Sequence, residues 1–237
     1  MSSITQHEVD IFESRLVKII ERGPWALSNQ LCAIYIHNLP ASPWLDLAQY
    51  PSVAEAARLL QQSADGLRAD FANLQEHDLL WHDEDCIAAR GGAWLRFEAN
   101  GIEAIKDGEG CSIYTPSACR LFQALRPTGV KGLRVSFSVV APNTWLQPHF
   151  GPTNANLKLH LGLVIPRAAD GTPCARMRVD SEWRAWEQDA ILFFDDSFEH
   201  EVVSECTLPR TVFQLVFRHP ALPPDEQGRM RTVVQQH

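Results

Sequence analysis

Two short segments each place a histidine among turn-forming residues. Residues 147–154 contain His149, residues 193–201 contain His200, and Arg210 follows ten residues after the second histidine. Neutral imidazoles suit borderline metals such as Fe(II). A guanidinium can clamp a carboxylate through two parallel hydrogen bonds. The pattern therefore predicts a metal centre held by His149 and His200, with an acidic co-substrate bound at Arg210.

A long apolar stretch, Leu157–Ile165, lies between the two histidine segments and is typical of a β-strand. Side chains alternate between the two faces of a strand, so Lys158 and His160 share one face and three leucines occupy the other. A polar face inside a barrel has to meet something polar. We therefore expect Lys158 and His160 to face the site.

Short strands separated by turn signals dominate the second half of the chain. Turns are indicated by Ala141-Pro142-Asn143, by residues 170–173 and by residues 195–197. Strands are predicted at residues 94–97, 133–140, 157–165, 176–179, 182–186, 190–194 and 210–218. Many short strands with such punctuation are typical of a sandwich or barrel of the jelly-roll kind.

Helices are predicted mainly before these strands. Apolar residues at helical spacing indicate one helix over residues 8–22 and another through residue 74. Ser52 and Glu55 form a capping-box pattern at the start of the second helix. A third helix is bracketed by Pro116 and Gly129.

These elements suggest three regions. Residues 1–90 form a helical N-terminal extension packed on the barrel, residues 91–220 form the core, and residues 221–237 form a polar tail. A single domain of this size can bury a substantial core.

Composition excludes several classes of partner. The chain has 45% hydrophobic residues, 21% charged residues and a net charge of −8. The negative charge argues against nucleic acid and anionic membranes as partners. We see neither a signal peptide nor an apolar segment that could span a membrane, and expect a cytoplasmic protein. Six scattered cysteines without a CxxC motif favour isolated, reduced thiols.

Three ordered motifs resemble the aspartyl/asparaginyl β-hydroxylase family. They are His149-x-Gly151-Pro152-Thr153-Asn154, Leu159-His160-Leu161-Gly162-Leu163 and the segment Phe194–Glu201, and the resemblance covers about residues 94–220. Members of this family are Fe(II)- and 2-oxoglutarate-dependent oxygenases. The resemblance implies a mainly β fold, namely a double-stranded β-helix (a jelly-roll, cupin-like barrel) with flanking, mostly N-terminal α-helices.

The resemblance also implies an iron centre with two protein ligands. His149 and His200 would be the catalytic residues that bind the metal. The usual non-haem pattern adds a carboxylate two residues after the first histidine, where this chain has Gly151. The family also has glycine there, and its iron is completed by 2-oxoglutarate and water.

Four further residues match positions that hold the co-substrate or the substrate. Arg210 would pair with the distal carboxylate of 2-oxoglutarate, and Ser138 would hydrogen-bond the same group. His160 would contact the co-substrate. Lys158 replaces an arginine of well-known relatives, near where the family holds the acidic substrate side chain. Lysine keeps the charge but lacks the planar fork, so the substrate is left open.

Other residues near the motifs have more than one interpretation. Asp195, Asp196 and Glu201 could be ligands, but turn capping and orientation of His200 are favoured. Tryptophans can line the pocket or belong to the core; they are Trp94, Trp145 and Trp186. The resemblance also permits a disulfide between Cys111 and Cys119.

The predicted function is a dioxygenase that uses Fe(II), 2-oxoglutarate and O2 to hydroxylate a C–H bond. Because no membrane anchor or repeat region is visible, we expect the substrate to be a small molecule, an amino-acid-like compound or a short peptide. Two alternatives remain open: a metal-dependent cupin that uses no 2-oxoglutarate, and a non-catalytic β-barrel binding protein.

Overall fold

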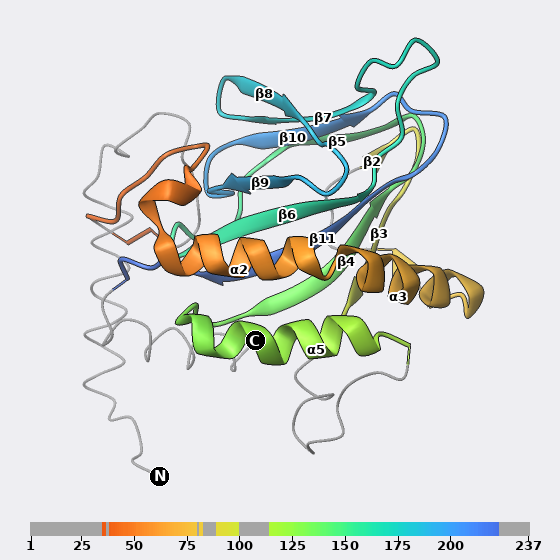
Figure 1. Ribbon diagram of the computed structural model, residues 1–237. Coiled ribbons are helices and arrows are strands. Elements are labelled where there is room, and N and C mark those ends of the chain that lie inside the picture. The colour runs from red at the N-terminus through yellow and green to blue at the C-terminus, as the bar shows by residue number, and fades with distance from the viewer. Residues whose placement is uncertain (1–34, 37, 80, 83–88, 100–113, 223–237) are drawn as a thin grey trace, which may run out of the picture.

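Two antiparallel β-sheets form the body of the protein. The structure, a computed structural model, describes residues 35–36, 38–79, 81–82, 89–99 and 114–222. The larger sheet has the strand order β1-β3-β4-β11-β6-β9 and the smaller sheet has the order β2-β5-β10-β7-β8 (Figure 1). The strands are β1 (Trp81–His82), β2 (Ala89–Arg90), β3 (Trp94–Glu98), β4 (Arg134–Val140), β5 (Thr144–His149), β6 (Asn156–Val164), β7 (Ala175–Val179), β8 (Glu182–Ala185), β9 (Ile191–Phe194), β10 (His200–Ser204) and β11 (Arg210–Arg218). The predicted double-stranded β-helix is confirmed.

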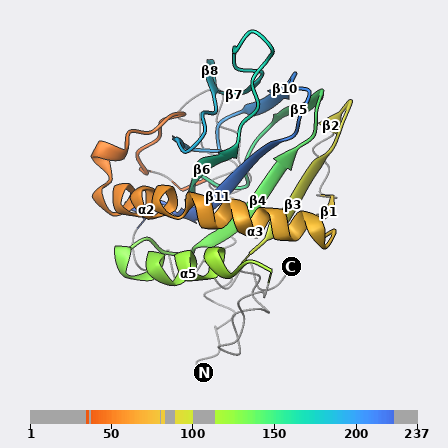
Figure 2. The ribbon, with the colours of Figure 1, turned by 45° about the vertical axis from the view of Figure 1, so that its right-hand side comes forward.

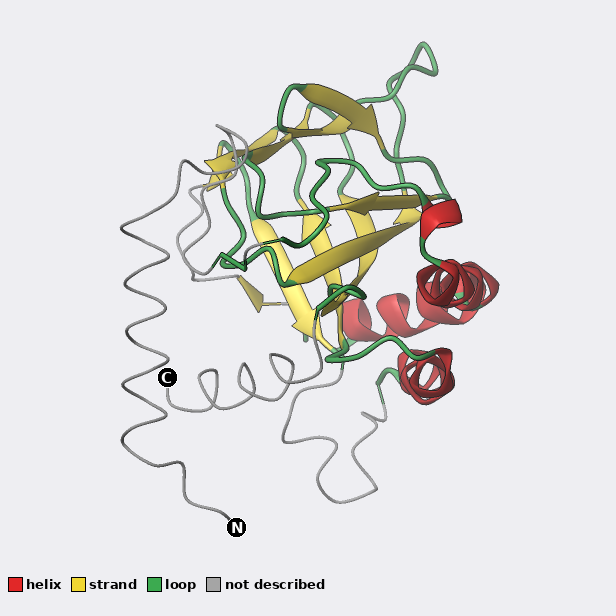
Figure 3. Cartoon of the chain, turned by 90° about the vertical axis from the view of Figure 1, so that its left-hand side faces the viewer, coloured by secondary structure: helices red, strands yellow, loops and turns green. Residues whose placement is uncertain are grey.

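Three α-helices gather on one side of this barrel (Figure 3). They are α2 (Pro51–Gln62), α3 (Ala64–Glu76) and α5 (Pro116–Leu125), with the short 3-10 helices η1 (Leu47–Gln49) and η2 (Arg126–Thr128). Figure 2 shows α2 and α3 running across β6, β11, β4 and β3. The predicted helix at residues 8–22 lies outside the described residues.

The predicted start and length of the second helix are wrong in detail. The helix begins at Pro51 with Tyr50 at the N-cap, so Ser52 lies in the first turn and cannot cap it. Proline is favoured there because the first N–H groups of a helix have no intrahelical partner. The helical stretch also breaks at Ser63, whose hydroxyl donates to the Leu59 carbonyl over 2.9 Å.

The main core lies between the helices and the outer face of the larger sheet. Leu157, Leu159 and Leu161 of β6 are fully buried there, together with Phe213 and Leu215 of β11. The helices contribute apolar faces to the same core, as their predicted periodicity required; their most buried members are Val53, Leu60, Leu67 and Leu74. The opposite, inner face of the sheet is thereby left for Lys158 and His160, as predicted.

The strand prediction succeeded from β3 onward except where the histidines lie, and it also missed the two-residue strands β1 and β2. Each of the six predicted strands from residue 133 onward occurs within one residue of its predicted ends. The strands β5 and β10 were not predicted, although they carry His149 and His200. Pro148 interrupts the first pattern, since proline cannot donate to a strand ladder. The strand β10 has only five residues and follows turn-forming residues, so its short apolar alternation was not recognised in the sequence.

The expectation of isolated thiols is wrong for Cys174 and Cys206, which form a disulfide with a Cα–Cα distance of 5.0 Å. They are distant in sequence, but antiparallel pairing of β7 with β10 places Ala175 opposite Ser204 and so brings the two cysteines together. Cys119 is disulfide-bonded too. Cys111, the partner that the resemblance permits for it, lies outside the described residues.

None of the described helices has both the length and the apolar character needed to cross a bilayer.

Candidate metal and co-substrate site

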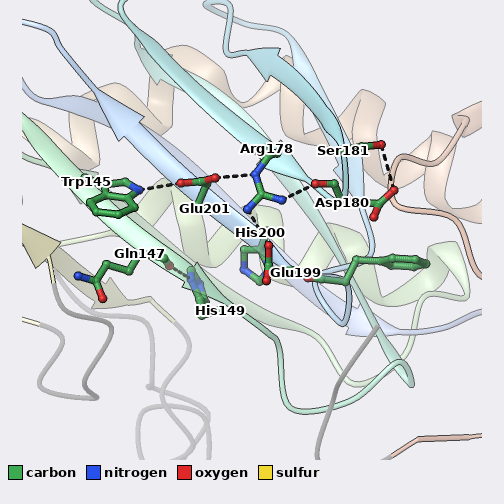
Figure 4. Close-up of polar contacts among 10 residues, drawn as sticks. Trp145, Gln147, His149, Arg178, Asp180, Ser181, Glu199, His200 and Glu201 are labelled. Atoms are coloured by element: carbon green, nitrogen blue, oxygen red, sulfur yellow. Dashed lines mark hydrogen bonds and ion pairs between the residues drawn. The ribbon is translucent and has the colours of Figure 1, made fainter. Parts of the chain in front are cut away.

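His149 and His200 are direct neighbours across two paired strands. His149 ends β5 and His200 begins β10, and the two residues are opposite each other in the ladder. Their ring centroids are 4.1 Å apart, and Figure 4 shows the two imidazoles side by side. The fold thus joins two segments that are 51 residues apart in the sequence.

Backbone carbonyls fix the tautomer of both rings. His149 Nδ1 is 2.7 Å from the Gln147 carbonyl oxygen. His200 Nδ1 is 2.9 Å from the Phe198 carbonyl oxygen. A carbonyl only accepts, so each Nδ1 carries the proton and each Nε2 keeps its lone pair. Metal-binding histidines are commonly oriented in this way.

Burial keeps both imidazoles neutral. Desolvation is the main cause that lowers the pKa of His149, and it lowers the pKa of His200 to about 3, with a further contribution from the neighbouring His149. Neutral imidazole is the form that binds a metal ion. The donor set therefore fits Fe(II) or a similar borderline metal.

Gly151 leaves room for a carboxylate from another segment. A Cβ at this position would overlap the carboxylate of Asp196. The Gly151 N–H donates to the Asp196 carbonyl over 2.6 Å. Lys158 Nζ is 2.8 Å from Asp196 Oδ2, whereas Oδ1 is buried without a hydrogen-bond partner among the described residues. The Asp196 carboxylate thus lies beside residue 151, the position at which the usual non-haem motif has a carboxylate of its own.

Asp195 has the turn-capping role that the sequence favours. Its Oδ1 accepts hydrogen bonds from the backbone N–H and the hydroxyl of Ser197, over 2.9 Å and 2.5 Å. Burial, the largest cause, raises the pKa of Asp195 to about 7.

Glu201 is directed away from the histidine pair into a polar network on β10. Arg178 Nε donates to Glu201 over 2.5 Å, and Arg178 Nη2 donates to Glu199 over 2.8 Å. The indole of Trp145 donates to the second oxygen of Glu201 over 2.7 Å. Figure 4 shows this network beside the two rings. It ties both neighbours of His200 to adjacent strands.

Arg210 is a buried cation without an anionic partner. Its side chain is among the most buried in the protein, at 2% relative exposure. The guanidinium lies 4.3 Å from the centroid of the Trp186 ring, and Nη1 is 3.5 Å from the Ser138 carbonyl oxygen. No carboxylate pairs with it among the described residues, and its Nε has no hydrogen-bond partner there.

The Arg210 guanidinium remains charged despite this burial. Desolvation lowers its pKa to about 9, which still leaves it protonated at neutral pH. A buried, unpaired charge is costly. The surroundings of Arg210 are therefore suited to bind an anion.

Ser138 and His160 lie near this cation with hydrogen-bonding capacity to spare. Ser138 Oγ accepts from the Trp94 indole over 2.9 Å and still has its own proton to donate. His160 Nε2 is 3.0 Å from Gln214 Oε1, and its Nδ1 has no partner among the described residues. The ring stacks on Trp186 with centroids 6.1 Å apart.

Desolvation, the largest cause, holds the pKa of His160 well below its usual value. Trp186 Nε1 is also buried without a partner among the described residues. Three unsatisfied polar atoms thus belong to neighbouring side chains, because Arg210 and His160 both lie beside Trp186. Buried polar groups are rarely left unpaired, so together they indicate a polar ligand.

A cavity of about 290 Å³ adjoins the histidine pair on the inner face of the larger sheet. Lys158 and Asp196 line it next to Gly151. The remaining lining residues are Arg96, Glu98, Arg134, Val135, Ser136, Pro152, Asn156, Gln214 and Val216. The sequence motifs did not single out Arg96, Glu98, Arg134 or Gln214, although strand alternation in β3, β4 and β11 places them on the inner face.

The predicted site residues thus fall into two adjoining groups. His149, His200 and Lys158 lie around Asp196. His160 and Arg210 lie beside Trp186, and the Ser138 carbonyl accepts from Arg210. No group of three or more His, Cys, Asp or Glu side chains within the described ranges is placed to hold a metal ion. The candidate centre offers the two neighbouring imidazoles of His149 and His200, and their role as metal ligands stays a prediction.

The fold and its contents define the class of protein: a cupin-like double-stranded β-helix that carries a histidine pair and a buried arginine. The family model described as aspartyl/asparaginyl β-hydroxylase matches residues 61–220. The chain belongs to this family of hydroxylases.

Relatives of known name support this assignment. The chain is 30% identical over 215 residues to "Aspartyl/asparaginyl beta-hydroxylase" of Homo sapiens, a match that covers 90% of this chain and 27% of the human protein. It is 36% identical over 88 residues to "Ornithine lipid ester-linked acyl 2-hydroxylase" of Rhizobium tropici, covering 37% of this chain and 30% of that protein. The chain thus spans only about a quarter of the human relative.

Among solved structures, a Pseudomonas putida prolyl-4-hydroxylase matches with a TM-score of 0.43 and 18% identity, covering 67% of this chain and 88% of the other.

Proposed function

We propose that this protein is an Fe(II)- and 2-oxoglutarate-dependent dioxygenase. Its substrate would be a small molecule, an amino-acid-like compound or a short peptide, hydroxylated at a C–H bond. The observation that carries the proposal is Arg210, a buried cation without an anion, placed in the same barrel as two neutral histidines. A dicarboxylic acid that binds a metal through one end and an arginine through the other fits both features.

Each residue has a distinct task in this proposal. His149 and His200 would hold the metal through their Nε2 atoms. Arg210 would pair with the distal carboxylate of 2-oxoglutarate, and the Ser138 hydroxyl would donate to the same group. When bound, Fe(II), 2-oxoglutarate and O2 supply the oxidation of the C–H bond, with succinate and CO2 as co-products.

The walls of the site would support this chemistry by excluding water. Phe194, Trp186 and Val212 are fully or almost fully buried around the polar groups. Electrostatic interactions are stronger in such a setting than in water. Lys158 holds one oxygen of Asp196, which leaves the other free to accept a hydrogen bond from a group bound at the metal side.

The test begins with protein purified without oxygen. Fe(II) is added, then 2-oxoglutarate, and the weak visible charge-transfer band of the ternary complex is recorded. We expect the band in the wild type and its loss in His149→Ala and His200→Ala. Iron binding without a band would favour a cupin that uses no 2-oxoglutarate. Absence of both would favour a binding protein.

A further inference from the structure

The cavity beside the histidine pair has an uneven distribution of charge. Three cations line it, namely Arg96, Arg134 and Lys158, against two carboxylates, Glu98 and Asp196. Both carboxylates are already paired. Lys158 Nζ is 2.8 Å from Asp196, and Arg96 Nη2 is 3.7 Å from Glu98. One positive charge in the lining therefore remains uncompensated.

Arg134 is that charge. Its guanidinium makes no ion pair or hydrogen bond with any residue that the structure describes. The side chain is exposed at the start of β4 and lines the cavity. An exposed arginine in a cavity can be reached by a ligand without breaking an existing contact.

Strand register places Arg134 of β4 two strands away from Lys158 of β6 on the inner face of the larger sheet. Arg134 pairs with Val216 of β11, and Val216 pairs with Lys158 of β6. The three residues therefore lie in one row across the inner face of the sheet. Two strand spacings separate the backbones of Arg134 and Lys158, on the order of 10 Å. A ligand that contacted both Arg134 and a group near Lys158 would carry those two contact points several bonds apart.

We propose that Arg134 anchors an anionic group of the substrate, remote from the C–H bond that reacts. The substrate class is thus an acid, with its carboxylate or similar oxyanion at Arg134 and its reacting carbon near the histidine pair. Arginine suits this role because its planar fork matches a carboxylate. The volume of about 290 Å³ suits a compound of amino-acid size or one side chain of a peptide.

This inference rests on the proposed function for the reaction, but its binding test does not depend on turnover. The protein is loaded with Mn(II) and saturating 2-oxoglutarate, so that the Arg210 site is filled. Isothermal titration then compares N-acetyl-L-aspartate with its uncharged analogue, N-acetyl-L-asparagine amide. A capped, alanine-flanked aspartyl peptide and its asparaginyl analogue form the second pair of probes.

Two variants are measured beside the wild type. Arg134→Gln removes the proposed anchor, and its exposed position should leave the fold intact. Arg120→Gln is the matched control, because Arg120 lies on α5 and bonds only with Ser117 among the described residues. Circular dichroism confirms that both variants are folded.

We expect at least one acid to bind the wild type ten-fold or more tightly than its uncharged analogue. Arg134→Gln should abolish that preference, and Arg120→Gln should keep it. Preference for the free acid would indicate a small-molecule substrate, and preference for the peptide would indicate an acidic side chain within a chain. Equal binding of acids and amides, or an unchanged preference in Arg134→Gln, would overturn the proposal. Failure of the proposed function would appear separately, as absence of the charge-transfer band.

Discussion

At Arg210, burial and charge conflict unless a ligand is bound. The guanidinium contacts the face of Trp186 and a backbone carbonyl, but no carboxylate among the described residues neutralises it. The cation–π contact contributes on the order of 2 kcal/mol when desolvated. This is less than the cost of burying an unpaired charge, which is several kcal/mol. The residue is therefore best explained by an anion that binds there.

Replacing Arg210 should weaken 2-oxoglutarate binding strongly. Arg210→Gln leaves the distal carboxylate without its cation, which costs on the order of 3–5 kcal/mol. Titration of the Mn(II)-loaded variant measures the affinity. Arg210→Lys keeps the charge but not the planar guanidinium fork, so its affinity for 2-oxoglutarate should lie between those of Arg210→Gln and the wild type. An unchanged affinity in Arg210→Gln would remove the assigned role.

Gly151 and Asp196 should depend on each other. A methyl group at residue 151 would overlap the Asp196 carboxylate, so Gly151→Ala should destabilise the protein by about 1–3 kcal/mol. In an Asp196→Ala background the space is open, and the same change should cost much less. Urea unfolding of the four proteins gives the coupling free energy. Additive effects would show that the two positions do not compete for space.

At the scale of elements, β10 is positioned by contacts on both sides of His200. Arg178 of β7 binds Glu199 and Glu201, and Trp145 of β5 binds Glu201. Ladder pairing with β5 fixes His200 opposite His149. The ligand pair therefore depends on three strands rather than on the two that carry it.

Loss of Arg178 should weaken the metal centre without contacting it. Arg178→Gln leaves Glu201 largely buried without its cation, at a cost of about 1–3 kcal/mol. We expect weaker Mn(II) binding, measured by titration, together with lower stability. Arg184→Gln on the neighbouring strand β8 is the control, since its ion pair with Glu182 is exposed. If Arg178→Gln lost stability but kept its full metal affinity, the network would have no positioning role.

For the molecule as a whole, the Cys174–Cys206 disulfide ties the start of β7 to the chain beyond β10. It closes a loop with a sequence separation of 32 that contains His200. By restricting the unfolded chain, a disulfide that closes a loop of this length stabilises the folded protein by roughly 3–4 kcal/mol. The Cys174→Ser/Cys206→Ser variant should lose about that much stability in urea unfolding. A cost near zero would mean that the sheets already fix these ends.

Disulfides persist mainly in oxidising compartments. The cytoplasmic location therefore stays a prediction, which alkylation of freshly isolated protein before reduction would test through the state of these thiols.

Acid should destabilise the metal-free protein. Burial lowers the folded-state pKa of His149, His160, His200 and His219 below the value near 6.5 that the unfolded chain has. The unfolded state therefore binds more protons, and stability falls as pH drops below about 6.5. Asp195 has the opposite effect. Its pKa is raised to about 7 in the folded state, so its contribution to the stability of the protein falls as pH rises towards 7. Since four histidines act against one aspartate, we expect a lower free energy of unfolding, measured in urea, at pH about 5 than at pH about 7.5. A higher free energy of unfolding at the lower pH would contradict this expectation.

The sequence by itself determined the barrel and singled out the candidate residues of its site. Alternation fixed which face of β6 carries Lys158 and His160, because side chains of a strand point in opposite directions by turns. Local motifs singled out His149, His200 and Arg210, and local turn chemistry predicted the capping by Asp195. Each of these inferences depends on residues that are close in the chain.

Only the tertiary structure decided how distant segments meet. The placement of Asp196 in the space left by Gly151, the burial of Arg210 against Trp186 and the Cys174–Cys206 bond depend on strand pairing between segments that are far apart in the chain. The unpaired charge of Arg134 likewise became visible only when β3, β4, β6 and β11 were in register. Such contacts are set by the packing of two sheets, and no local pattern encodes which residues that packing brings together.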